Sequence, residues 1–283
     1  EEGDDLDFST IKNLELEDKW ILKRLNNVIE EVTKNLENYE IGLAASRIEN
    51  FIWEEYCDWY IEFAKLRLYG EDEEAKADVK KVLLYVLNKM IALLHPFMPF
   101  ITEEIYSALP DKKDMLIVEE WPRFEEKFEF INEEATVNSA IEAITAIRNQ
   151  RASLNVGAKT KQNLIILAEN ESYKNLLDEL KDQFVNLANA GDVKVLLKEE
   201  FNEDKEGLVN LVFNEFTVLM SLDDLMDYDK ERARLNDEIK RLESEIKRAS
   251  GKLNNQNFVN KAPEAVVNEE REKLANYEDL LEK

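Results

Sequence analysis

The sequence contains very few of the residues that form cross-links or metal sites. It has one cysteine, Cys57, and one histidine, His95, among 283 residues. A single cysteine excludes an internal disulfide, and we expect a buried, reduced thiol in a cytoplasmic protein. One cysteine and one distant histidine also cannot form a zinc site of the usual kind. We therefore expect no metal ion in this chain.

Glycine, proline and long apolar runs are scarce as well. Seven glycines and five prolines leave few obligatory turns, and the abundant Leu, Ile, Glu, Lys and Asn favour helices. No apolar run approaches the roughly 20 residues that cross a bilayer. The N-terminus, EEGDDLDFST, has neither the basic nor the apolar part of a targeting signal. We expect a soluble, mainly α protein without a membrane partner, and the missing initiator Met is expected of a piece of a longer protein.

Motifs of catalysis are absent from the sequence. It has no glycine-rich phosphate loop, no G-x-S-x-G and no metalloprotease helix. Its 62 acidic residues are so many that a pair of carboxylates carries no information. We expect no catalytic residue and no cofactor in this chain.

The net charge of −25 argues against a nucleic-acid partner until its distribution is considered. Residues 240–264 hold six basic and three acidic side chains, a local charge of +3. Residues 140–163 hold four basic side chains and one acidic one, again +3. These two basic segments are candidate phosphate-binding surfaces.

Apolar residues at steps of three and four predict helices at about 16–36, 41–68, 75–94, 99–109 and 132–154. Pro96 interrupts the third helix, and Pro99 suits the first turn of the next one. The first four helices predict an antiparallel bundle.

The period of the pattern changes after residue 160. Short β-type runs at 163–169 and 193–197 flank a helix at about 172–188, and two further runs at 208–213 and 216–222 enclose Asn214 and Glu215. These runs predict a small α/β subdomain.

The last part of the chain carries heptad spacing on both sides of a turn rich in asparagine. It predicts an antiparallel coiled-coil hairpin in which Ala249 faces Val267, with a first helix on the order of 40 Å long. Phe258 and Val259 fall at the tip, either as a hydrophobic cap of the coil or as a contact for a partner. Glu270 occupies a core position, where we expect it to pair with Arg248 or Lys247, or else to lie in a wet, locally frayed layer.

The predicted fold class is therefore mainly α, with an antiparallel helical bundle, a small α/β subdomain and a C-terminal antiparallel coiled-coil hairpin. The predicted domains are residues 1–130, 131–224 and 225–283.

Several stretches resemble the C-terminal part of the bacterial valyl-tRNA synthetase family of class I aminoacyl-tRNA synthetases. HPFMPFITEEIY, from His95, is shared with related synthetases, whereas NFVNKAPEAVV, from Asn257, singles out the valine family. Gly157 and Ala158 depart from the prolines usual in the family. The other matching stretches are DKWILKRLN, FIWEEYCDWYIEFAKLRL, IVEEWP, AIRNQRASLNV and SLDDLMDYDKERARL.

The resemblance implies an anticodon-binding helical domain and a coiled-coil arm that braces the tRNA elbow. It implies a parent ligase that uses ATP and valine in a catalytic domain with HIGH and KMSKS motifs. Neither motif occurs in this sequence, so we expect the chain to be inactive alone. The expected partner is tRNA specific for valine, not DNA, and the expected state is a monomer.

The candidate tRNA-binding residues are the cations of the two basic segments and the tip. Their alternative role is to form ion pairs on a solvated surface. Trp53, Tyr56, Trp59 and Tyr60 are expected in the core, with at most two free to stack on bases, and His95 is expected to cap or pack. The alternative function is a protein-interaction module that presents the hairpin to a protein partner. The candidates are Arg148, Arg151, Lys159, Lys161, Lys240, Arg241, Lys247, Arg248, Lys252, Phe258 and Lys261.

Overall fold

The chain divides into two compact units, residues 1–221 and 222–283. The computed structural model describes residues 8–110, 114–154, 156, 157, 159–202, 207–221, 228–255, 260 and 263–282, with the side chains of 228–235, 264, 265, 278 and 282 excepted. Among the helices described, none is both long enough and apolar enough to cross a bilayer. The mainly α fold class is confirmed.

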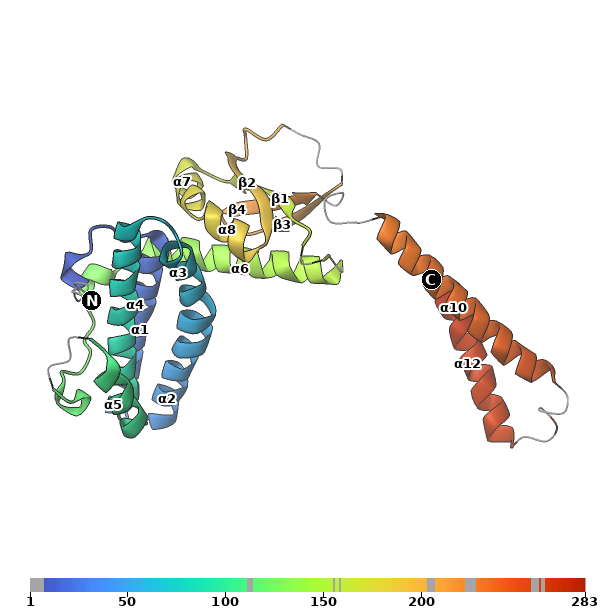
Figure 1. The fold of residues 1–283 in the computed structure, drawn as a ribbon, viewed down its shortest axis with the longest axis horizontal. Helices are drawn as coiled ribbons and strands as arrows, with labels where there is room; N and C mark the ends of the chain where they lie inside the picture. The colour runs from blue at the N-terminus through green and yellow to red at the C-terminus, as the bar shows by residue number, and fades with distance from the viewer. Residues whose placement is uncertain are drawn as a thin grey trace. The chain divides into compact units, whose positions relative to one another are not determined.

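The first unit begins with a helical bundle, coloured blue to green in Figure 1. Its helices are α1 (Leu16–Glu37), α2 (Ile41–Asn50), α3 (Ile61–Leu68), α4 (Glu73–Leu94) and α5 (Pro99–Ala108). Asp72 caps α4 because its carboxylate accepts hydrogen bonds from the amides of Glu74 and Ala75. The apolar faces predicted from the sequence meet in one core. Its largest members are Trp20, Phe51, Tyr60, Phe63, Ile21 and Ile48.

The predicted single helix at 41–68 contains a π-helical segment, Phe51–Tyr60, between α2 and α3. A π-helix bonds residue i to residue i+5, so its turn is wider than an α turn. Phe51, Tyr56 and Tyr60 are buried at spacings of five and four, which fits that wider turn. These three aromatic residues thus pack on the core without interrupting the helical backbone.

The HPFMPF segment separates α4 from α5 as predicted, with Pro99 in the first turn of α5. His95 Nδ1 lies 2.8 Å from Thr102 Oγ1, whose hydroxyl in turn donates to the carbonyl of Met98 at 2.9 Å. His95 therefore links the end of one helix to the start of the next. Three short 3₁₀ turns complete this part: η1 (Phe8–Thr10), η3 (Leu116–Val118) and η4 (Glu126–Phe128).

The α/β subdomain follows the long helix α6 (Ile131–Ser153). Its sheet has the order β2-β1-β4-β3, in which β1 pairs parallel with β2 and antiparallel with β4, and β4 pairs antiparallel with β3. The helix predicted at 172–188 is two helices that meet at Leu180. The elements are β1 (Gln162–Ala168), α7 (Glu171–Glu179), α8 (Lys181–Leu187), β2 (Ala190–Leu197), β3 (Leu208–Val212) and β4 (Phe216–Ser221).

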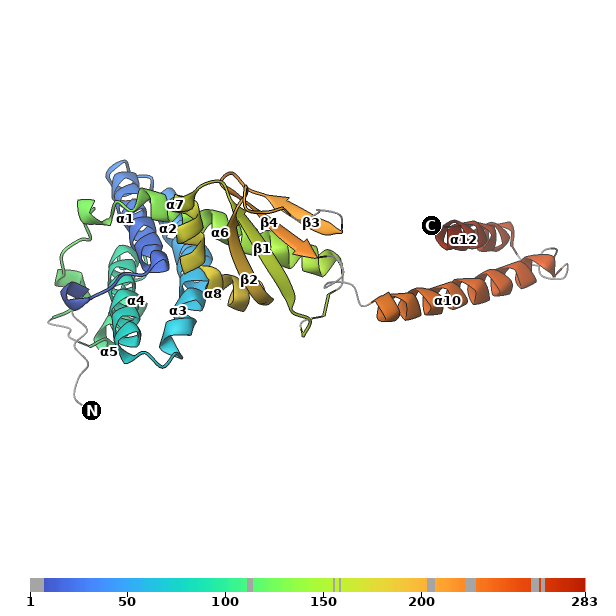
Figure 2. The same cartoon turned by 90° about the horizontal axis from the view of Figure 1, so that it is seen from above.

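Helix α6 joins the bundle to the α/β subdomain, as Figures 1 and 2 show. Near its start, Asn138 Oδ1 accepts a hydrogen bond of 2.8 Å from Trp20 Nε1 of α1. Near its end, Arg148 Nε donates to the carbonyl of Leu187 in α8 at 2.8 Å. One helix therefore fixes the cations at its C-terminal end relative to both parts of the first unit.

The second unit is the predicted helical hairpin, formed by α10 (Tyr228–Asn254) and α12 (Glu264–Glu282). Leu242, Ala249 and Val267 are buried between the two helices. The burial of Ala249 together with Val267 agrees with the register expected from the heptads.

Candidate nucleic-acid interface

Arg148 is an exposed cation with a fixed position on α6. Besides the bond from its Nε to Leu187, its guanidinium lies over the ring of Trp59, 5.5 Å from the ring centre. A guanidinium above an aromatic ring is attracted by the π electrons of its face. No described residue bonds to the two terminal nitrogens of Arg148. They are available to form the forked hydrogen bonds that suit phosphate oxygens.

Arg151, one turn further along α6, has a different placement. Only 7% of its surface is exposed. It donates to the carbonyl of Thr160 at 2.6 Å, to that of Gly157 at 3.4 Å and to Gln162 Oε1 at 3.1 Å. Arg151 thus holds the loop between α6 and β1, and the predicted phosphate contact finds no support in this placement.

Lys159 and Lys161 lie on the loop that Arg151 holds. Both side chains are exposed, and neither forms an ion pair with a described residue. An exposed lysine without a partner can meet a phosphate at little cost, because no existing contact has to break. The basic segment at 140–163 therefore presents three cations, Arg148, Lys159 and Lys161, around one structural arginine.

The aromatic residues of the π segment differ in burial according to their position along the helix. Tyr56 and Tyr60 are buried, Trp59 is half-buried beneath Arg148, and Trp53 is 62% exposed. The expectation that most of these rings pack in the core agrees with this placement. Trp53 is the ring most open to stack on a base.

The arm presents its cations mainly in weak, exposed pairs. Arg241 pairs with Glu238 at 2.7 Å, Lys240 with Asp237 at 3.8 Å and Arg248 with Glu245 at 3.5 Å, each within α10. Such pairs contribute about 0–1 kcal/mol and exchange readily for another anion. Lys247 is exposed and pairs with no described residue.

Among the described residues of the arm, Lys252 forms an ion pair that joins α10 to α12, and this pair corrects a prediction. Glu270 was expected to pair with Arg248 or Lys247, but its Oε1 lies 2.8 Å from Lys252 Nζ. The hydrogen bond from Lys252 lowers the pKa of the Glu270 carboxyl below its ordinary value. The Lys252 ammonium therefore stabilises the contact between the two helices and is less available to an RNA phosphate.

The predicted tip of the arm lies outside the described residues. This applies to Phe258, Val259 and Lys261. Whether the apolar pair caps the coil or contacts a partner stays a prediction.

A buried polar network in the first unit was not predicted from the sequence. Asp18, fully buried on α1, accepts hydrogen bonds of 2.5 and 2.6 Å from the two terminal nitrogens of Arg67 and one of 2.6 Å from the Tyr60 hydroxyl. Next to it, Glu17 Oε1 accepts a bond of 2.9 Å from Gln183 Nε2 on α8. The network therefore joins the bundle to the α/β subdomain.

Glu17 should make the stability of the first unit depend on pH. Its burial raises the pKa of the carboxyl from 4.5 to about 7. Between these values the folded chain binds a proton that the unfolded chain has lost, so stability falls as pH rises through this window. The expected loss is on the order of 3 kcal/mol, at about 1.36 kcal/mol for each pKa unit.

Urea unfolding at pH 5 and pH 8, followed by tryptophan fluorescence, measures this loss. Glu17→Gln keeps an acceptor for Gln183 and cannot ionise, so its stability should fall less between the two pH values than that of the unchanged chain. The same pH dependence in both proteins would show that the pKa of the Glu17 carboxyl is not raised. All four tryptophans precede residue 122, so the signal reports on the first unit alone.

In a comparison with known proteins, each of the two units matches the model of a known protein family. Residues 18–166 match the family model of the anticodon-binding domain of tRNA ligases, and residues 227–283 match that of the valyl-tRNA synthetase tRNA-binding arm. The chain is 42% identical over 282 residues to a valine–tRNA ligase of Clostridium perfringens and 43% over 278 residues to one of Clostridium tetani, covering 97% of this chain and 31% of the relative each time. One from Oceanobacillus iheyensis is 38% identical over 273 residues, with coverage of 96% and 31%. The chain spans about a third of the length of these relatives.

Proposed function

The chain belongs to the valyl-tRNA synthetase family, and from this premise we propose that it binds the tRNA for valine through two surfaces. The helical bundle with α6 would meet the anticodon region, and the hairpin would brace the tRNA elbow. Both would support ATP-dependent aminoacylation with valine, carried out by a catalytic domain outside this chain. The matches of the two units to an anticodon-binding domain and to a tRNA-binding arm support this proposal.

The placement of Arg148 is the observation that most strongly supports RNA binding by the first unit. Its guanidinium is held in place by Leu187 and Trp59, while its terminal nitrogens have no described partner. A cation already fixed in its binding geometry loses little conformational entropy when it contacts a phosphate. It therefore contributes more to affinity than a flexible surface lysine does.

The charge of the arm supports RNA binding by the second unit. In a chain of net charge −25, residues 240–264 carry +3. Folded RNA presents closely spaced phosphates, and each contact with a cation releases condensed counterions. The alternative prediction is a hairpin that contacts a protein partner. It requires no affinity for RNA, so a measurement of tRNA binding distinguishes the two predictions.

Replacement of Arg148 tests the proposal in the first unit. Arg148→Ala should weaken binding of valine tRNA roughly 10-fold at low salt, since hydrogen bonds from a charged group contribute about 1.5–3 kcal/mol. Filter binding with labelled tRNA measures the change. Arg123→Ala is the matched control, because Arg123 is exposed in the same unit and forms no hydrogen bond or ion pair with a described residue. Equal losses in the two variants would contradict a specific role for Arg148, and no binding by the unchanged chain would contradict the proposed function.

A further inference from the structure

A groove of about 370 Å³ lies between α5 and the segment around η3, and we call it the α5 groove. Phe100, which lines it from α5, is 92% exposed, and Met115 and Ile117, which line it from the η3 segment, are both more than half exposed. Single apolar residues on a surface are ordinary, whereas several gathered at one place and rimmed by polar residues mark an interaction site. None of the surfaces described above includes the α5 groove.

The two walls of the α5 groove are held together by contacts within the bundle. Leu116, which lies between the two exposed residues of the η3 segment, is buried in a cluster with Ile91 and Tyr106. The amide of Leu116 donates to Glu103 Oε1 on α5 at 3.0 Å, and the Tyr106 hydroxyl donates to Glu119 Oε1 at 2.9 Å. A partner therefore meets a preformed groove, and little conformational entropy is lost when it binds.

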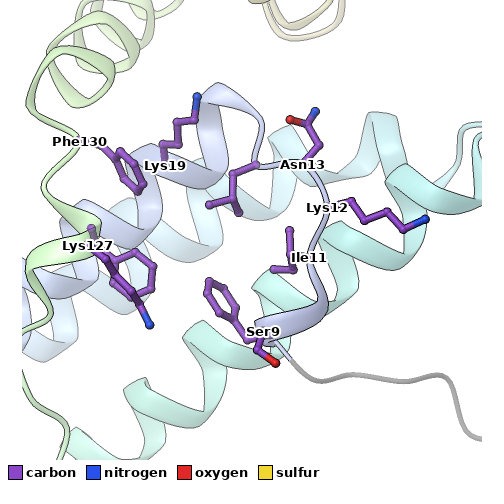
Figure 3. A pocket seen from close by; sticks show the side chains of 10 residues that line it. Ser9, Ile11, Lys12, Asn13, Lys19, Lys127 and Phe130 are labelled. Carbon is purple, nitrogen blue, oxygen red and sulfur yellow. The ribbon is translucent and has the colours of Figure 1, made fainter.

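The α5 groove carries negative charge. Its described lining residues include Glu103 and Glu104 and no lysine or arginine. Glu104 is exposed, and its carboxylate forms no hydrogen bond or ion pair with a described residue. The pocket in Figure 3 has the opposite character, because its described lining includes Lys12, Lys19 and Lys127 and no carboxylate. The negative charge therefore distinguishes the α5 groove from another concave site of the same unit.

An apolar groove with carboxylates at its edge is complementary to an apolar side chain flanked by lysine or arginine. An RNA strand does not fit this description, because its phosphates would face Glu103 and Glu104. An amphipathic helix of a protein does, since its apolar residues repeat every three or four positions and can lie in a groove while basic residues flank them.

We propose that the α5 groove binds a basic amphipathic helix of another protein. An apolar side chain of that helix packs between Phe100, Met115 and Ile117, and its lysines or arginines pair with Glu103 and Glu104. Glu103 can do so while it holds the amide of Leu116, because a carboxylate accepts several hydrogen bonds. This inference does not rest on the proposed function, and a failure of tRNA binding leaves it standing.

Replacement of Phe100 tests the apolar part of the proposal. The probe is a fluorescently labelled synthetic helix with leucines along one face and lysines beside them, and its binding is followed by fluorescence anisotropy. Phe100→Ala should weaken binding on the order of 10-fold, because the burial of one large aromatic side chain is lost. Tyr69→Ala is the matched control, since Tyr69 is an exposed aromatic residue that does not line the groove. It should leave the affinity within about two-fold.

Reversal of one charge tests the electrostatic part. Glu104→Lys should weaken binding of the same probe about 5-fold at low salt and less at high salt, because an attraction at the edge of the groove becomes a repulsion. Glu49→Lys makes the same change at an exposed glutamate of α2 and should alter the affinity less than about two-fold. A second probe, with glutamate in place of each lysine, should bind at least about 10-fold more weakly than the first. Equal affinity for the two probes, or full affinity of Phe100→Ala for the first, overturns the proposal.

A measurement on the unchanged sequence locates the bound probe. In the chain labelled with ¹³C-methyl methionine, the signal of Met115 should shift when the basic probe is added, while that of Met220, fully buried in β4, stays in place. Binding without a shift of Met115 means that the probe occupies another acidic surface, and it overturns the proposal. A dimer seen by light scattering that Phe100→Ala abolishes makes a second copy of this chain the occupant, and a shift of Met115 with tRNA alone makes it RNA. Either result also overturns the proposal.

Discussion

Reversal of the charges of Lys247 and Arg248 in one variant, K247E/R248E, should weaken binding of valine tRNA roughly 10- to 100-fold at low salt. Each lost hydrogen bond from a cation to a phosphate removes about 1.5–3 kcal/mol in good geometry and less where water screens it. The slope of log affinity against log salt should also become shallower by about two, because two fewer counterions are released. Both side chains are exposed, so the hairpin should stay folded.

The control for this variant lies on the other helix of the arm. Lys273 of α12 is about half exposed and pairs with Glu269 at 2.7 Å. Lys273→Glu changes the charge of the arm outside the basic segment, and it should alter affinity less than three-fold, as expected of a surface pair. Lys252 is left unchanged in both proteins, because a glutamate there would face Glu270 and destabilise the hairpin. Equal losses for the two variants would show that α10 makes no directed contact with tRNA.

Replacement of Asp18 by alanine should reduce the free energy of unfolding of the first unit by about 3–5 kcal/mol, the range observed when one member of a buried ion pair is removed. Asp18 is fully buried and accepts hydrogen bonds from Arg67 and Tyr60. Without it, the Arg67 guanidinium stays in a poorly solvated site with Glu17, 3.9 Å away, as its remaining carboxylate. Urea unfolding followed by tryptophan fluorescence measures the loss.

An exposed ion pair on a neighbouring helix provides the comparison for Asp18. Glu62 pairs with Lys65 at 2.5 Å on α3, and both side chains are more than a third exposed. Glu62→Ala should reduce stability by less than about 1 kcal/mol. A small effect of Asp18→Ala, similar to that of Glu62→Ala, would mean that the network contributes little to the stability of the first unit.

The helices and strands could be predicted from the sequence because their signals are local. The apolar steps of α1 and the heptads of α10 each span several turns, and Pro99 identifies the start of α5. The π segment was not predicted, since aromatic residues at spacings of five and four also fit an α-helix whose face is wide. The break at Leu180 was missed because the apolar pattern continues through it.

The partners of individual side chains could not be predicted. Arg151 follows Arg148 by three residues, and both look alike in the sequence. Only the fold brings three acceptors to Arg151, the carbonyls of Gly157 and Thr160 before β1 and the side chain of Gln162 at its start. Glu270 was assigned to the core from its heptad position, but its partner depends on the reach of side chains across the hairpin. A pocket lined by Ile11, Lys19 and Phe130, among others, joins segments more than a hundred residues apart (Figure 3), which no local pattern indicates.

Titration of the chain with valine tRNA and with a noncognate tRNA, by filter binding at two salt concentrations, tests the central claim most directly. The account predicts tighter binding of valine tRNA, with an affinity that falls steeply as salt rises from about 50 to 200 mM, as phosphate contacts require. Equal affinity for both tRNAs and for an unstructured RNA of the same length, measured on folded protein, would contradict it.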